Sequence, residues 1–143
     1  MISILLSILS LILFVVLSII DLFFLMFKDV KQRKWYQLID SRAFNKAYNV
    51  DVFGNYQFCD LWNWALIKKG GYKFGKLGET ISSALGKNIK RKTLTLAGKA
   101  LCFIIDFIDV SQWKNGLKGK GFHCVNSIMT HEQIQNFYKN VTQ

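Results

Sequence analysis

The chain has 143 residues, of which 51% are hydrophobic, and its formal net charge is +10. This length is enough for one small domain and offers too few strands for a parallel β-α-β nucleotide-binding core. The basic balance leaves nucleic acid and an anionic membrane surface as the classes of partner to weigh.

The first 27 residues predict a transmembrane helix. They contain one charged side chain, Asp21, and residues 2–20 form an uncharged apolar run interrupted only by serines. A bilayer core of ~30 Å needs about 20 apolar residues at ~1.5 Å rise each. A cleavable signal peptide would carry basic residues before the run and small residues after it, whereas residues 23–27 read FFLMF. We therefore interpret residues 1–27 as a retained anchor.

Charge next to the anchor predicts its orientation. Four basic side chains follow it closely: Lys28, Lys31, Arg33 and Lys34. Basic flanks stay in the cytoplasm, so the N-terminus should face outward and residues 28–143 should form a basic cytoplasmic domain. The three cysteines would then lie in a reducing compartment, where structural disulfides are not expected.

The predicted domain carries most of the charge. All 19 Lys and Arg and eight of the nine acids follow residue 27, which gives this part a formal net charge of +11. Because basic residues near an anionic membrane gain roughly 1 kcal/mol each, we expect the domain to lie on the inner leaflet. The candidate lipid-binding residues are Lys68, Lys69, Lys73, Lys76, Lys87, Lys90, Arg91 and Lys92. A membrane-tethered nucleic-acid binder is an alternative, but no known nucleic-acid motif supports it.

Polar residues of the anchor share one side. They are Ser3, Ser7, Ser10, Ser18 and Asp21. At ~100° per residue they fall within a stripe about 80° wide. Hydroxyl residues allow close approach of helices, and a carboxylate facing lipid is costly, so a homo-oligomer formed through this stripe is one expectation. The alternative is that Asp21 reaches the cytoplasmic headgroups.

Periodicity beyond the anchor predicts a mainly α domain, with an α+β alternative because residues 48–53 alternate like a short strand before a turn at Gly54-Asn55. The anchor helix is expected to continue through Ala43. The other predicted elements are a helix over 58–67, a short helix over 81–85 stopped by Gly86, a basic linker over 88–92, a helix over 94–108, a loop over 112–121 and a helix opened by a capping box at Thr130.

Residues 70–76 match the start of a phosphate-binding P-loop, G-x-x-x-x-G-K. The motif needs a Ser or Thr next, because that hydroxyl binds magnesium, and this chain has Leu77. The loop must also follow a buried strand, whereas the preceding apolar run has a helical period. We interpret the segment as a glycine and lysine turn and expect no nucleotide or other cofactor.

The cysteines and histidines suggest one alternative chemistry. Cys59 and Cys102 lack the paired spacing of zinc ligands, so no metal site is expected. A helix N-terminus lowers the pKa of a thiol, and Cys59 opens a predicted helix, so a membrane-tethered thiol enzyme using Cys59 or Cys124 with His123 as base is an alternative. The simpler interpretation is that free cysteines are small buried hydrophobes.

A further polar set surrounds the glycine loop. Asp60 and Asn63 share a helix face, and Glu79, Thr80 and Ser82 open the next helix, where Thr80 or Ser82 can serve as a cap. The segments DLWN (60–63), GG (70–71), GETIS (78–82) and HCVNSI (123–128) resemble a family of short phage and prophage proteins.

That resemblance implies a protein of phage or prophage origin in the inner membrane of a bacterial host. The family has no assigned activity, and many members begin near the membrane. The chain departs from the pattern at Gly78, where the family often has Asp, and in a longer basic insert. The family does not require a cysteine at position 59, which weakens the thiol-enzyme alternative. The polar site candidates that the resemblance implies are Asp60, Asn63, Glu79, Thr80, Ser82, His123, Cys124 and Ser127. The leading hypothesis is a non-enzymatic, single-pass protein whose basic domain engages a partner protein.

The predicted topology can be tested with a reporter fused after Gln143. Because the basic flank should stay inside, a reporter that works only in the cytoplasm should be active. Activity from a reporter that works only outside the cytoplasm would reverse the orientation and the expectation of reduced cysteines.

Overall fold

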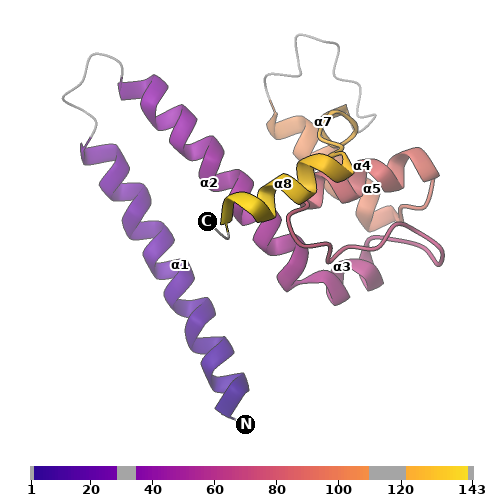
Figure 1. The fold of residues 1–143 in the computed structure, drawn as a ribbon, viewed down its shortest axis with the longest axis horizontal. Coiled ribbons are helices and arrows are strands. Elements are labelled where there is room, and N and C mark those ends of the chain that lie inside the picture. Colours follow the sequence, from indigo (N-terminus) through magenta and orange to yellow (C-terminus); the bar gives the residue numbers. More distant parts are fainter. Residues whose placement is uncertain (1, 29–34, 110–121, 142–143) are drawn as a thin grey trace. The chain divides into compact units, whose positions relative to one another are not determined.

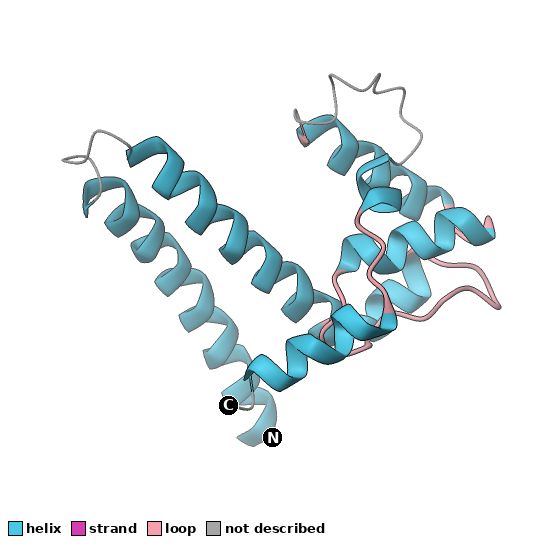
Figure 2. Cartoon of the chain, turned by 45° about the horizontal axis from the view of Figure 1, so that its top comes forward, coloured by secondary structure: helices cyan, strands magenta, loops and turns pink. Residues whose placement is uncertain are grey.

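The computed structural model describes residues 2–28, 35–109 and 122–141. It is mainly helical (Figure 1, Figure 2), and the helices are α1 (Ile2–Lys28), α2 (Trp35–Gln57), α3 (Cys59–Ala65), α4 (Ile81–Arg91), α5 (Leu96–Ile108), α7 (Phe122–Asn126) and α8 (His131–Val141). In these residues the β structure is one isolated antiparallel bridge between Ile67 and Leu94. The chain divides inside α2 into two compact units, Met1–Lys46 and Ala47–Gln143, which we describe separately.

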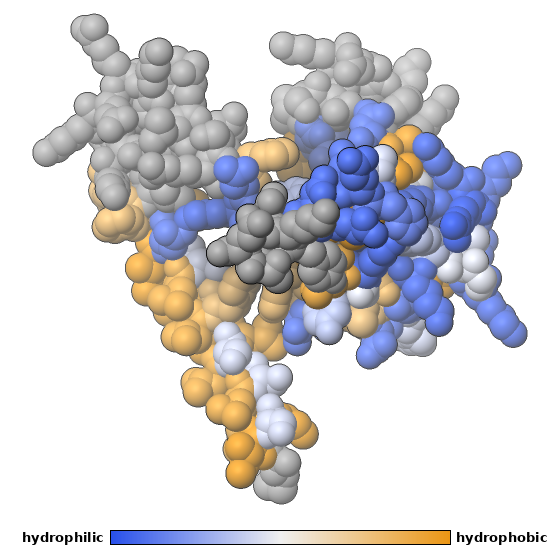
Figure 3. All heavy atoms as spheres, viewed as in Figure 1, coloured by the Kyte–Doolittle hydropathy of each residue, from blue (hydrophilic) through white to orange (hydrophobic). Residues whose placement is uncertain are grey.

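In the first unit, α1 is long and apolar enough to cross a bilayer. The candidate span, Ile2–Phe24, has 23 residues, and its side chains are exposed, whereas a core helix of a soluble protein would bury one face. Figure 3 shows α1 as a column of hydrophobic atoms with paler atoms along part of it. The predicted polar stripe requires one continuous helix, and α1 provides it. Asp21 forms an ion pair with Lys46 of the same unit. A predicted continuation of this helix to Ala43 crosses residues 29–34, which lie outside the described residues.

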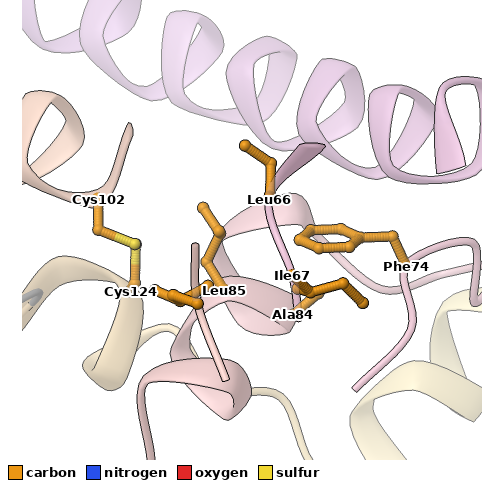
Figure 4. Packing of buried hydrophobic residues seen from close by; sticks show 8 residues of the cluster. Leu66, Ile67, Phe74, Ala84, Leu85, Cys102 and Cys124 are labelled. Atoms are coloured by element: carbon orange, nitrogen blue, oxygen red, sulfur yellow. The ribbon is translucent and has the colours of Figure 1, made fainter. Parts of the chain in front are cut away.

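The core of the second unit forms where α4 packs against α7 and α5. Its buried hydrophobic residues are Leu66, Ile67, Phe74, Ala84, Leu85, Leu94, Cys102 and Cys124. Figure 4 shows the aliphatic side chains and Phe74 gathered together, with Cys102 and Cys124 at one side. The core therefore draws on the loop before α4 as well as on the helices.

Glycine allows α4 to approach α7 closely. A Cβ at Gly86 would lie 2.0 Å from the backbone oxygen of Cys124. The prediction that Gly86 stops the helix was therefore wrong: the residue serves packing, and α4 continues to Arg91. The predicted basic linker over 88–92 is mostly the last turn of α4, and Lys92 ends it in the left-handed conformation with φ 58°.

The predicted strand over 48–53 was also wrong, because these residues lie inside α2. Val52 and Asn55 are buried, and the Asp51 carboxylate accepts from the backbone N–H of Ile81. Asp51 and Asn55 share one side of the helix. Through Asp51 and the bonds of Asn55 to Gly75 and Glu79, this side is connected to the segment around α4. Tertiary contacts thus override an alternation that favours a strand.

The helix opened by Thr130 is confirmed as α8. Gln133 N donates to Thr130 Oγ1 at 3.3 Å, and Thr130 N donates to Gln133 Oε1 at 2.8 Å, which is the reciprocal pattern of a capping box. The helix predicted over 94–108 is confirmed as α5, with Thr95 as its cap. The helix predicted over 58–67 is shorter, and the loop predicted over 112–121 lies outside the described residues.

Replacing Gly86 with alanine should destabilise the second unit by at least about 2 kcal/mol, since the new methyl group would meet backbone rather than a yielding side chain. Urea unfolding of the full chain in detergent micelles, followed by tryptophan fluorescence, measures the change. Gly54→Ala in α2 is the matched control, because the nearest atom is the end of the Ile81 side chain at 3.1 Å. We expect Gly54→Ala to be neutral or stabilising by up to ~1 kcal/mol. Equal effects of the two substitutions would contradict the packing role of Gly86.

Candidate functional site

The loop between α3 and α4 is held by side-chain amides. Tyr72 N donates to Asn88 Oδ1 at 2.8 Å, and Asn88 Nδ2 donates to the Tyr72 carbonyl at 2.8 Å. Two residues on, Phe74 N donates to Asn63 Oδ1 at 2.8 Å, and Asn63 Nδ2 donates to the Phe74 carbonyl at 3.2 Å. Each amide thus pairs with both backbone groups of one loop residue, as a neighbouring β-strand would.

A third asparagine, Asn55 of α2, completes the arrangement. Its Oδ1 accepts from Gly75 N at 3.1 Å, and its Nδ2 donates to the carbonyls of Lys76 and Glu79 at 3.2 and 2.7 Å. Asn55 and Asn88 are fully buried, so the bonds satisfy both the asparagines and the loop.

This geometry gives the glycine motif a structural role. In a P-loop, backbone N–H groups point at a phosphate. Here the N–H groups of Tyr72, Phe74 and Gly75 donate to asparagine oxygens instead. The ammonium of Lys76 lies 3.1 Å from His131 Nδ1, and no βαβ unit occurs among the described residues.

A buried carboxylate lies at the end of the loop. Glu79 is fully buried, and its oxygens accept from Tyr72 Oη at 2.7 Å, Ser83 Oγ at 2.7 Å and Lys87 Nζ at 2.5 Å. Lys87 also lies over the Tyr72 ring, 4.6 Å from its centroid. Burial, followed by the bond to Glu79, raises the pKa of Tyr72, so the hydroxyl stays a donor. This set joins the loop to α4 through charge-assisted hydrogen bonds.

Other polar side chains accept hydrogen bonds from the first backbone N–H groups of α4. Thr80 caps the helix by accepting from Ser83 N at 3.0 Å, and Asp51 accepts from the N–H groups of Ile81 and Ser82 at 3.2 and 3.4 Å. Burial raises the pKa of Asp51, although the bonds from Ser82 and Ile81 and the nearby His123 oppose the shift. The capping interpretation of Thr80 is therefore confirmed.

The candidates on α7 are engaged with α5. His123 N donates to Asp106 Oδ1 at 2.8 Å, and His123 Nδ1 lies 2.5 Å from Asp109 Oδ2. Cys124 is fully buried, and a hydrogen bond with Cys102, followed by burial, raises the pKa of its thiol. A buried neutral thiol is a poor nucleophile, so this geometry gives no support to catalysis by Cys124.

The structure brings several predicted site residues together and leaves others apart. Glu79, Thr80 and Ser82 meet at the start of α4, where Asp51 accepts from Ser82 N. Asp60 is exposed on α3, and Ser127 closes the end of α7 through a backbone bond to His123. Cys59 lies against Gly75, where a Cβ would come within 2.8 Å of the Cys59 Cβ.

Sequence reasoning missed important members of the network: Asp51, Asn55, Tyr72, Ser83, Asn88 and Asp106. The asparagines themselves were an available signal. The backbone of a buried loop without a strand partner needs other hydrogen-bond partners, and an asparagine side chain supplies both a donor and an acceptor. The sequence does not show which asparagines reach the loop.

The backbone also brings two basic segments together. Lys68 N donates to the Thr93 carbonyl at 2.8 Å, which places the segment Lys68-Lys69 beside the end of α4. The guanidinium of Arg91 lies 5.2 Å from the centroid of the Tyr72 ring. We call this set the basic cluster: Lys68, Lys69, Lys73, Lys90, Arg91 and Lys92, all exposed. Lys87 differs, because its ammonium pairs with Glu79.

Comparison of the chain with protein-family models, with curated proteins and with solved structures gave no match. Interpretation of the site therefore depends on its geometry. Among the residues searched, no group of three or more His, Cys, Asp or Glu could hold a metal ion. The polar network is internally satisfied: no buried side-chain N or O atom in the described part lacks a hydrogen-bond partner.

Glu79→Ala should destabilise the second unit by about 3–5 kcal/mol, because it leaves Lys87 without its counter-charge and removes the acceptor for two hydroxyls. That is a large part of a typical total of ~5–15 kcal/mol. Urea unfolding in micelles measures the loss. Glu132→Ala on the exposed side of α8 is the control, and a cost for Glu79→Ala no larger than for Glu132→Ala would show that the network is not a stabilising element.

Proposed function

We propose that the chain is a non-enzymatic single-pass membrane protein whose basic domain binds the anionic inner leaflet. In this proposal α1 spans the inner membrane of a bacterial host with its N-terminus outside, and residues 28–143 face the cytoplasm. The resemblance to phage and prophage proteins supports the choice of host. The observation that carries the proposal is the basic cluster, which two separate segments of the chain build at one place.

Several features of the basic cluster fit a lipid surface. Its side chains are exposed, and in the part of the chain that the structure describes its lysines form no ion pair with an acid. Hydrophilic atoms cover much of the visible face of the second unit in Figure 3. Because lysine binds phosphate as a point charge, such a surface suits lipid headgroups of varied geometry.

The polar network supports a role without catalysis. Glu79, the three asparagines and Asp51 hold backbone or neighbouring side chains. These groups stabilise the loop that carries Lys73 and the helix that carries Lys90 and Arg91. The network thus supports the binding surface in place of forming a reaction centre.

Association through α1 belongs to the same proposal. The polar stripe from Ser3 to Asp21 would face a second copy, which allows close helix approach. The ion pair of Asp21 with Lys46 offers the carboxylate a partner within its own chain, so self-association is not needed to neutralise it. An unidentified protein partner would meet the cytoplasmic domain.

The proposal predicts that anionic lipid protects the basic cluster. The full chain is reconstituted in lipid nanodiscs, treated with a membrane-impermeant amine-acylating reagent, and analysed by mass spectrometry. Modification of Lys68, Lys69 and Lys73 should slow severalfold in discs containing phosphatidylglycerol relative to discs of phosphatidylcholine alone, and salt should remove the difference.

Lys139 is the internal comparison, because it is distant in the sequence from the members of the basic cluster. Equal rates in the two kinds of disc would refute binding to anionic lipid. Protection by added DNA that exceeds protection by anionic lipid would favour the nucleic-acid alternative.

A further inference from the structure

The outward side of α5 is apolar. Its inward side buries Gly98, Cys102 and Asp106. Its large exposed side chains include Leu96, 85% exposed, Ile108, 70%, Phe103, 57%, and Ile104, 52%. A surface helix of a soluble protein normally shows the opposite arrangement, with polar residues outward, and extended exposed apolar patches mark interaction sites.

The length of α5 limits what can cover it. Its 13 residues extend ~20 Å at ~1.5 Å per residue, which is too short for a bilayer core of ~30 Å. Lys99 and Asp109 also lie near its two ends. A short helix with one apolar side fits the boundary between headgroups and acyl chains, lying in the plane of the membrane.

The N-terminal end of α5 adjoins the basic cluster. Thr95 N donates to the Leu66 carbonyl at 3.0 Å, and Thr95 Oγ1 donates to the Ala65 carbonyl at 2.7 Å. These bonds place Leu96 beside the end of α3, where Trp64 is 82% exposed. Exposed tryptophan next to lysine and leucine is the composition of a membrane–water interface.

We propose that the outward side of α5, together with Trp64, inserts into the acyl–headgroup boundary of the bilayer that holds α1. The occupant is lipid: the neighbouring lysines complement anionic headgroups, and they would repel the same lysines of a second copy placed on this surface. The proposal adds a hydrophobic contact to the electrostatic one and depends on the proposed function for the location of the domain at the membrane.

Collision accessibility of a spin label tests the insertion. The full chain carries Cys59→Ser with Ile104→Cys, labelled with a nitroxide, in nanodiscs containing phosphatidylglycerol. Cys102 and Cys124 can remain, because both are buried and hydrogen-bonded to each other. We expect the label to collide severalfold more with oxygen than with a water-soluble nickel chelate. The same label on Gln135→Cys, at an exposed polar position of α8, should show the opposite preference.

Equal access of the nickel chelate to the labels at 104 and 135 would overturn the proposal. Spin–spin broadening at 104 that disappears on dilution with unlabelled chain would also overturn it, because the occupant would then be a second copy. Leu96→Cys gives an independent position on the same side if Ile104→Cys loses its helical circular dichroism. If lysine protection by anionic lipid persists while the label at 104 is open to nickel, the insertion fails and the proposed function stands. If both readouts fail, the domain does not lie on the membrane.

Discussion

Pairing between asparagine amides and loop backbone is the interaction on which the second unit depends. Residues 72–76 lack a strand partner among the described residues, so Asn55, Asn63 and Asn88 supply the donors and acceptors. An unpaired buried backbone group costs about as much as a lost hydrogen bond, and several would exceed what a small core can offset. With the amides in place, Phe74 enters the core and Glu79 reaches the start of α4.

Holding a polar loop inside has a consequence for the surface. Polar side chains occupy buried positions that apolar side chains fill in most small domains: Asn55, Asn88, Glu79, Ser83 and Asp106. Apolar residues of α3 and α5, Trp64 and Leu96 among them, lie outside. This distribution is unfavourable in water alone and would become favourable if a bilayer covered the apolar side, as we propose.

Local signals allowed the sequence to predict some elements and not others. The capping box at Thr130 and the helix over 94–108 were correct, because hydrogen bonds and periodicity within a few residues determine them. Gly86 was misread as a helix stop, because its role is set by the backbone of Cys124, far away in the sequence. The strand expected over 48–53 failed for a related reason, since contacts of Asp51 with the start of α4 and of Asn55 with the loop before it select a helix. Glu79 and Asn63 were found as polar candidates, but their partners depend on the fold.

The geometry of the basic cluster depends on the same network of asparagine hydrogen bonds. Asn88 Oδ1 accepts from Tyr72 N and from Thr93 Oγ1, at 2.8 and 2.6 Å, so one buried side chain connects the loop to the segment after α4. Thr93 in turn accepts from Lys68 N, which brings Lys68 and Lys69 beside Lys92. Like charges placed close together repel one another. The lysines of the basic cluster stay close together because buried hydrogen bonds hold the backbone that carries them. That repulsion would be relieved by an anionic surface, whereas the pairing of Lys87 with Glu79 is already satisfied within the protein. The fold therefore separates a lysine that stabilises the domain from lysines that form no ion pair with an acid among the described residues.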